Sequence, residues 1–443
     1  MAIPAKQIGW SNESNLLWGI WKDLDSLGRI AASGNGSSPS NPVNVVLPAT
    51  ASDSFGRQRV SEPYTLFDSS HRYADNGLWS TVTGTGGTAV FNEDQGLMDL
   101  IVSSALDAEV IRETTKVFSY QPGKSLLVLS TFVMSPAKTG LRQRVGYYGS
   151  DNGLFVQLEG STLSFVKRTS INGGPDDIVV TQANWNYDKL DGSGPSGLTL
   201  DITKAQILWM DIEWLGVGSV RMGFVINGQF ILCHTFNHAN IIASTYITTA
   251  SLPLRYEIRN TAVTSGLSVL KQICSSVISE GGYELRGLQQ AVGTPITTPR
   301  VLTVAGTYYP VISLKLKSTK LDGIAVISAT SIMGVGNGKN FAYRIVAGAT
   351  TTGGSWVDAT ATSCVQYNIT GTSVTGGRIL ASGFINSSNQ GSPTTNLLKE
   401  ALFATQLERN GLTGEAYEVT IEITASTASE SIYASVDWEE VSR

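Results

Sequence analysis

Charged residues are scarce in this chain of 443 residues. Asp, Glu, Lys and Arg together make up 15% of it, and the formal net charge is -5, whereas about a quarter of the residues in an average soluble domain are charged. Binding to nucleic acid requires clustered Lys and Arg side chains that neutralise phosphates. The sequence contains no such basic stripe, so nucleic acid is excluded as an expected partner.

Cysteine is also rare, and long apolar runs are absent. The three cysteines, Cys233, Cys274 and Cys364, are odd in number and far apart, which indicates free thiols and not a disulfide framework. No apolar run approaches the ~18 residues that span a bilayer, and the N-terminus lacks the cationic start and apolar core of a signal peptide. We therefore expect no membrane insertion, synthesis in a cytoplasm, and stability that comes from packing.

Glycine is abundant, with 46 residues, and it falls between short extended segments. Strand-like runs bounded by Gly, Asp, Asn or Pro recur over residues 65–279. Residues 220–226 and 229–234 flank Asn227-Gly228, the strongest short hairpin signal, because a type I′ turn needs positive φ at both central positions. Closely spaced strands with no helical pattern between them predict a β-sandwich or jelly roll.

The strand pattern breaks over residues 280–299, where two Thr-Pro pairs mark a boundary, because the residue before proline is pushed to an extended conformation. Strand-like runs resume over residues 300–443, and one helix-like segment at 395–408 interrupts them. We therefore predict an all-β chain with a jelly-roll sandwich over 51–290. A second sandwich with a short covering helix is expected over 291–443.

The one convincing helix lies near the N-terminus, over residues 2–30. Its apolar stripe consists of Leu17, Ile20, Trp21, Leu24 and Leu27. A helix of this length is marginal in water by itself, and the Ser, Gly, Asn and Pro residues that follow have linker composition. We predict a helical anchor over 1–32 and a linker over 33–50, with Trp10 and Trp18 at an interface with copies of the chain or another protein. The alternative is that the stripe packs on its own domain.

Few residues suggest catalysis. Asp211 and Glu213 share one face of a predicted strand roughly 6 to 7 Å apart, a separation that a glycosidase can use. The spacing is common, so a solvated outer face is the favoured interpretation and a glycan-degrading enzyme the alternative. His234 and His238 stand near Cys233, but no second pair of ligands completes a zinc site. We therefore expect no enzymatic activity, no cofactor and no metal.

Aromatic side chains suggest a binding function instead. Trp185, Tyr187 and Trp209 are candidate glycan contacts, and Trp79 and Trp356 are further stacking candidates. An aromatic ring combines a large apolar face with a polar group that suits a partly wet interface. Burial in the core is the alternative for each of these residues.

Three passages resemble virion structural proteins of tailed bacteriophages. They are KQIGWSNESNLLWGIWKDLDSL at 6–27, SDSFGRQRVSEPYTLFDS at 52–69 and QILWMDIEWLGVGSVRMGFVINGQFILCHTFNHAN at 206–240, and residues 300–443, with GGSW at 353–356, resemble the same group. The resemblance implies a non-enzymatic fibre or decoration appendage on the capsid or tail, a homotrimer attached to other virion proteins through its N-terminal segment.

The same resemblance implies a concanavalin-like or laminin-G-like jelly roll as the first sandwich. It also implies assembly in the cytoplasm of a bacterial host and a final location in the virion. It carries no catalytic residues, and a receptor-binding or glycan-binding module of a tail fibre or tailspike is the alternative function.

Overall fold

The computed structural model describes residues 63–75, 77–282, 287–388, 406–410 and 412–441, and the backbone alone of 394–396. The predicted anchor and linker, including Trp10, Leu17, Trp18, Ile20, Trp21, Leu24 and Leu27, lie outside the described residues. Among the described residues, no helix is long and apolar enough to cross a membrane.

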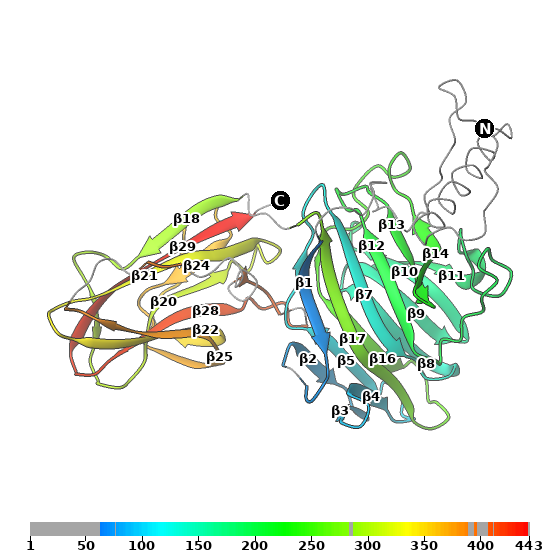
Figure 1. Cartoon of the computed structure of the whole chain (residues 1–443), viewed down its shortest axis with the longest axis horizontal. Coiled ribbons are helices and arrows are strands. Elements are labelled where there is room, and N and C mark those ends of the chain that lie inside the picture. The colour runs from blue at the N-terminus through cyan, green and yellow to red at the C-terminus, as the bar shows by residue number, and fades with distance from the viewer. Residues whose placement is uncertain are drawn as a thin grey trace, which may run out of the picture. The chain divides into compact units, whose positions relative to one another are not determined.

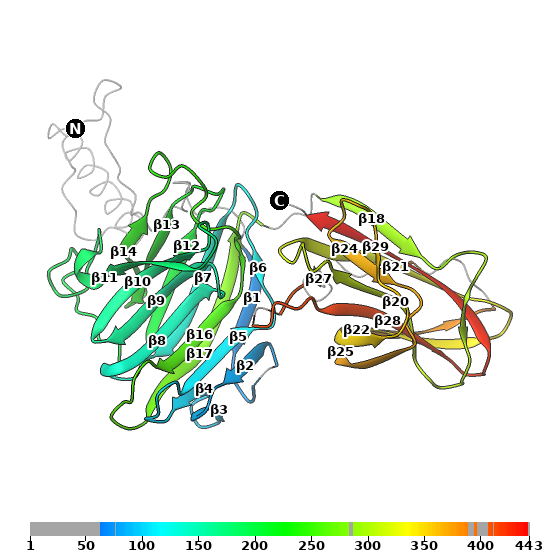
Figure 2. The same ribbon diagram turned by 180° about the vertical axis from the view of Figure 1, so that it is seen from behind.

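The first sandwich contains two large antiparallel sheets, which Figures 1 and 2 show from opposite sides. We name them the β7 sheet and the β8 sheet after a central strand of each. In spatial order, the β7 sheet contains β14 (Gln229–Phe236), β13 (Val220–Ile226), β12 (Gln206–Ile212), β7 (Ser125–Val133), β17 (Ser268–Glu280), β4 (Leu97–Val102) and β3 (Gly87–Asn92), and β1 (Pro63–Ser70) also pairs with β17.

The β8 sheet covers the other side of the same core. In spatial order, it contains β11 (Asp176–Thr181), β10 (Thr162–Thr169), β9 (Gly153–Gly160), β8 (Lys138–Tyr148), β16 (Leu254–Asn260), β5 (Glu109–Thr114) and β2 (Trp79–Thr83). Two short strands, β6 (Phe118–Ser119) and β15 (Ser251–Leu252), pair with each other, and a single 3₁₀ turn, η2 (Gln182–Asn184), follows β11.

Alternation along the strands explains how the two sheets form one core. Leu208, Met210 and Ile212 of β12 are at most 1% exposed and join the same apolar cluster as Tyr256 and Ile258 of β16. Successive side chains of a strand point to opposite faces, so every second side chain along each strand faces the other sheet. Full burial of one large apolar side chain contributes about 1.5 to 3 kcal/mol.

The hairpin predicted around Asn227-Gly228 is confirmed. β13 and β14 pair in antiparallel register, with Ile226 opposite Gln229. The two turn residues have φ of 53° and 75°. Positive φ at both positions is the condition for the type I′ turn that suits the twist of a hairpin.

The second sandwich has its own pair of sheets, which we name the β21 sheet and the β22 sheet. The β21 sheet contains β18 (Leu288–Gly293), β29 (Glu430–Val441), β21 (Ile324–Gly334) and β26 (Thr394–Asn396) in spatial order, with β19 (Arg300–Leu302) on β29 and β27 (Gln406–Leu407) on β21. The β22 sheet contains β23 (Val357–Asp358), β24 (Val365–Asn368), β20 (Tyr309–Leu316), β28 (Glu418–Ala425), β22 (Asn340–Thr352) and β25 (Ser373–Asn386).

A separate apolar cluster lies between these two sheets. Trp438 of β29 and Ile345 and Ile421 of the facing sheet are at most 3% exposed and belong to this cluster. The described part of the chain is therefore built from β-sandwiches, which confirms the all-β prediction.

The short covering helix predicted at 395–408 is wrong at both ends. β26 and β27 at those ends both pair with β21, and residues 397–405 lie outside the described chain. Apolar spacing of three and four residues suggested a helix, but pairing with an open strand edge determines the conformation of the ends that are described.

Candidate ligand-binding groove on the second sandwich

Two adjoining hollows lie beside the β22 sheet. The large hollow has a volume of about 560 Å³ and the small hollow one of about 200 Å³. Gly348 and Tyr417 line both of them, so we call the two together the groove. The size of the large hollow falls within the range of ~300 to 1,000 Å³ that small-molecule sites occupy.

A β-bulge in β22 accounts for the position of the groove. The pairing of β22 with β28 shifts register between Ala347 and Ala349, and Gly348 between them has φ of +71°. On the other side of β22, Gly376 and Gly377 of β25 also have positive φ. A bulge adds one residue to a strand, which bends the strand and increases its local twist. The bend occurs where Gly348 lines both hollows.

The large hollow contains a fixed carboxylate and a fixed ammonium group. Glu418 is 8% exposed, and its Oε2 accepts a hydrogen bond of 2.6 Å from the backbone N–H of Thr351. Its Oε1 lies 3.7 Å from Nζ of Lys315, and this Nζ lies 4.0 Å from the centre of the Trp356 ring. A cation over an aromatic face is attracted by the ring quadrupole, so the lysine is held from two sides.

Other polar groups complete the lining of the large hollow. The remaining residues with polar side chains are Ser318, Thr350, Gln366, Asn410, Glu415 and Tyr417. Together with Lys315 and Glu418, they offer amide, hydroxyl, carboxylate, ammonium and aromatic groups within one hollow. This mixture suits a ligand that has many hydroxyl groups and one apolar face.

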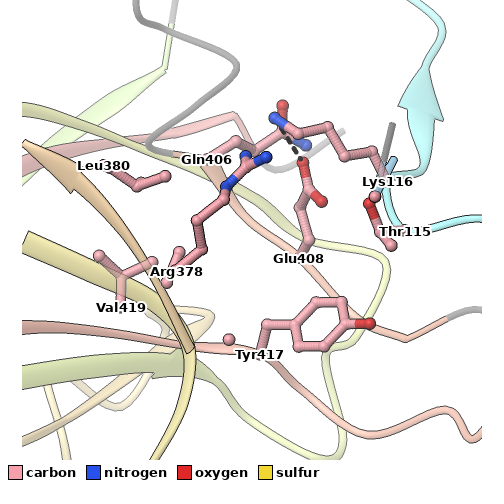
Figure 3. Close-up of a pocket in the computed structure, with 11 residues that line it drawn as sticks. Thr115, Lys116, Arg378, Leu380, Gln406, Glu408, Tyr417 and Val419 are labelled. Carbon is pink, nitrogen blue, oxygen red and sulfur yellow. Dashed lines mark ion pairs between the residues drawn. The ribbon is translucent and has the colours of Figure 1, made fainter. Parts of the chain in front are cut away.

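The small hollow contains a buried ion pair. Nζ of Lys116 lies 3.8 Å from Oε1 of Glu408, and Figure 3 shows these two side chains and Arg378 pointing toward one another above the Tyr417 ring. Glu408 is 7% exposed. Burial raises the pKa of Glu408 to about 8, although Lys116 attracts its charged form, and burial lowers the pKa of Lys116.

Two of the three candidate glycan contacts are buried and have other partners. Trp185 is 2% exposed and stacks on Phe165 at 4.3 Å between ring centres. Trp209 is 1% exposed and packs edge-on against Phe230 at 5.6 Å. Neither indole has a free face for a sugar, so the interpretation of these two as glycan contacts is wrong. Tyr187 is 54% exposed, and its assignment stays a prediction.

Asp211 and Glu213 do not form an open carboxylate pair on a solvated face. Asp211 is fully buried, forms an ion pair with Arg221 and accepts a hydrogen bond from the hydroxyl of Ser125. Oε2 of Glu213 accepts hydrogen bonds of 3.1 Å from the backbone N–H and the hydroxyl of Ser219. Alternation placed Asp211 opposite the core, but it gave no information about the partners that bury that face.

The histidines near the hairpin have structural partners. His238 is 1% exposed; its Nδ1 donates to the carbonyl of Gly218 at 2.6 Å, and its Nε2 accepts from Nζ of Lys167 at 2.8 Å. Burial lowers the pKa of His234 and of His238 to about 4. Within the part of the chain that the structure describes, no group of three His, Cys, Asp or Glu residues has the geometry of a metal site.

Most residues of the groove carry no recognisable signal in the sequence. Lys315, Arg378, Glu408 and Glu418 are far apart in the sequence and share no motif. Gly348 is an isolated glycine within a strand-like run, a pattern typical of a bulge. That glycine and Trp356, a stacking candidate whose ring lies 4.0 Å from Nζ of Lys315, are the sequence signals for the site.

Comparison with known proteins identifies no family. No protein-family model matches the chain, and no curated protein matches it. Among solved structures, the chain is similar to the Emp47p carbohydrate recognition domain (11% identity, 46% of this chain and 90% of that one, TM-score 0.30). It is also similar to arcelin-5 from Phaseolus vulgaris (6% identity, 49% of this chain and 98% of that one, TM-score 0.29). A third similar structure is a glycosyl hydrolase family protein from Mycobacterium fortuitum (7% identity, 48% of this chain and 99% of that one, TM-score 0.33).

These similarities carry no argument about the chain, because the identities and TM-scores are too low. The functional proposal therefore rests on the groove and on the sequence passages quoted above.

Proposed function

We propose that this chain is a non-enzymatic appendage protein of a tailed-phage particle, a fibre or decoration protein that binds a host-surface glycan. The single observation that carries the binding function is the groove, a large hollow of about 560 Å³ with a fixed carboxylate, a fixed ammonium group, amides and aromatic rings. The virion role rests on the three passages that resemble phage structural proteins.

The finer features belong to the same proposal. The first sandwich is a concanavalin-like or laminin-G-like jelly roll, and residues 1–32 attach the protein to capsid or tail proteins. The protein is a homotrimer, is assembled in the cytoplasm of a bacterial host and resides in the virion. It has no catalytic function, which agrees with the ion pair and hydrogen bonds that occupy the Asp211 carboxylate.

Binding is tested with the full chain on a glycan array, with two tyrosine variants as a matched pair. Tyr417→Ala removes an aromatic ring from the groove, whereas Tyr187→Ala removes an exposed ring of the first sandwich. We expect the wild-type chain to bind a set of glycans on the array. Tyr417→Ala should lower the affinity for these glycans at least tenfold, and Tyr187→Ala should leave it within twofold of wild type. If Tyr417→Ala folds poorly, Glu415→Gln replaces it as the test. Glu415 is exposed in the groove, and this variant should also weaken binding.

If the wild-type chain binds no glycan on the array, the binding function is contradicted. Equal losses in Tyr417→Ala and Tyr187→Ala contradict the location of the site. Polysaccharide that is shortened during long incubation with the protein contradicts the non-enzymatic assignment.

The virion role has a test of its own. A chain that lacks residues 1–42 should fold but fail to enter particles when it is produced during infection, because it lacks the predicted anchor. Normal incorporation of the truncated chain disproves attachment through the N-terminal segment.

A further inference from the structure

The small hollow brings together charged side chains from three separate places in the chain. Lys116 follows β5, Arg378 belongs to β25, and Glu408 follows β27. In Figure 3, their charged ends meet at one side of the hollow, and Tyr417 forms part of its floor. Charged groups lose hydration when they are buried, so the gathering of three charged side chains at one side of this hollow requires a physical reason.

The charges around this hollow do not cancel. Lys116 and Glu408 are neutral together as an ion pair. Within the described part of the chain, the side chain of Arg378 is exposed and forms no ion pair or hydrogen bond. The guanidinium of Arg378 is therefore an unbalanced positive charge beside the hollow.

The other charged groups near this end of the groove are already paired. Glu113 of β5, which acts electrostatically on Tyr417, is paired with Arg255 at 2.5 Å. Arg409 is paired with Asp322 at 3.0 Å. In the large hollow, Lys315 lies beside Glu418, while Glu415 is exposed. The positive end of the groove is thus confined to the small hollow.

We propose that the small hollow binds the anionic group of an acidic glycan, a carboxylate or a sulfate, while neutral sugar units of the same glycan occupy the large hollow. This inference rests on the proposed glycan-binding function and specifies the class of ligand. Arg378 supplies a planar pair of N–H donors that matches the two oxygens of an anion, and Lys116 supplies a second donor. Tyr417, which lines both hollows, contacts the sugar between them.

Two glycines of β25 account for the position of Arg378 beside the small hollow. Gly376 and Gly377 precede it with φ of +77° and +80°, and a Cβ on Gly377 would lie 2.7 Å from Val346 and Ala349 side-chain atoms. The two glycines let β25 pass close to the bulge of β22. This close approach puts Arg378 opposite Ala347, which also lines the small hollow.

The experiment uses the full chain on an array that carries uronic-acid, sialylated and sulfated oligosaccharides beside their neutral counterparts. Retained spots are then measured by calorimetry with wild type, Arg378→Gln and Arg259→Gln. Arg259 lies on β16 of the first sandwich and is partly exposed. Arg259→Gln therefore removes one positive charge, as Arg378→Gln does, but at a position outside the small hollow. We expect each acidic oligosaccharide to bind at least tenfold more tightly than its neutral counterpart. Arg378→Gln should abolish that preference, and Arg259→Gln should preserve it within twofold.

Each other outcome overturns the inference in a recognisable way. Equal affinity for acidic and neutral members disproves the anionic ligand class but leaves glycan binding intact. Equal losses in Arg378→Gln and Arg259→Gln assign the preference to overall charge and not to the small hollow. If no oligosaccharide binds, the proposed function fails and this inference fails with it.

Discussion

The two sandwiches share one architecture but differ in what their charged side chains do. On the outer face of the β8 sheet in the first sandwich, Nε of Arg255 donates to Glu113 at 2.6 Å, and Arg168 donates to Asp177 at 2.7 and 2.8 Å. In the second sandwich, strand glycines bend β22 and β25, and Arg378 remains unpaired among the described residues. The second sandwich also contains paired charges, such as Arg344 with the buried Glu422, but its Arg378 is an additional positive charge that is available to a ligand.

Aromatic rings reinforce this difference. In the first sandwich, the guanidinium groups of Arg144 and Arg168 lie 4.9 and 5.4 Å from the centre of the buried Phe155 ring. Burial opposes the ionisation of Glu257, but Arg144 and Arg142 outweigh burial and lower its pKa. In the second sandwich, the ring under Lys315 is Trp356, which is only partly buried beside an open hollow. The contact between a cation and an aromatic ring is therefore buried in the first sandwich, and in the second it lies beside an open hollow.

The largest effects should come from the two separate cores. Phe224 in the first sandwich and Phe341 in the second are at most 2% exposed, and each Phe→Ala substitution should cost about 3 to 5 kcal/mol in free energy of unfolding. Because the apolar clusters are separate, each variant should lower the calorimetric transition of its own sandwich. Two variants that lower both transitions equally would show that the sandwiches unfold as one unit.

A slightly smaller effect is expected from the buried ion pair of the first sandwich. Arg255→Ala leaves the fully buried Glu113 without its partner, which should lower the free energy of unfolding by about 3 kcal/mol. The double variant Arg255→Met with Glu113→Leu should recover most of that loss. Lys339→Ala breaks the partly exposed pair with Glu430 in the second sandwich and should change stability little, because water screens such pairs. Urea unfolding measures all three variants.

The first sandwich should lose stability in acid. His238 has a pKa of about 4 in the folded chain and a usual value of 6.5, so the unfolded chain binds more protons between these values and acid favours unfolding. The melting temperature of the first transition should fall as the pH drops from 6.5 toward 4. His238→Gln should flatten that dependence, and an unchanged slope would show that His238 does not titrate in this range.

The second sandwich should respond in the opposite direction. The pKa of Glu408 is about 8 in the folded chain, against a usual value of 4.5. The folded chain therefore binds more protons between these values, and this contribution to stability is lost as the pH rises toward 8. Glu408→Gln should remove the loss. A wild-type transition that is as stable at pH 8.5 as at pH 5 would contradict the pKa of Glu408.

A substitution at the bulge should change stability less than the substitutions in the two cores and in the buried ion pair. Gly348→Ala places a Cβ at an ordinary 3.9 Å from the Tyr417 ring, but at φ of +71°, so strain of about 1 to 2 kcal/mol is expected. The free energy of glycan binding should weaken by more than the free energy of unfolding, because the strand that lines both hollows is displaced. Calorimetry of binding and of unfolding on the same variant compares the two effects, and a fully retained affinity would show that the bulge does not shape the groove.

Local patterns predicted the parts of this fold that depend on local physics. The Asn227-Gly228 hairpin is correct because positive φ at two positions is a property of those two residues. Leu208, Met210 and Ile212 form core because alternation determines which side chains share a face. The segment 395–408 failed because the same apolar spacing fits a helix or a strand edge, and only the neighbouring β21 distinguishes them.

Composition and strand patterning were sufficient to predict the β-sandwich class and the scarcity of charged residues. Tertiary structure alone decided the rest: that Trp185, Trp209 and Asp211 are buried, and that Lys116, Arg378 and Glu408 meet around one hollow. The physical reason is that alternation assigns each side chain to a face of its strand, whereas burial, pairing and shared hollows depend on which distant segments cover that face.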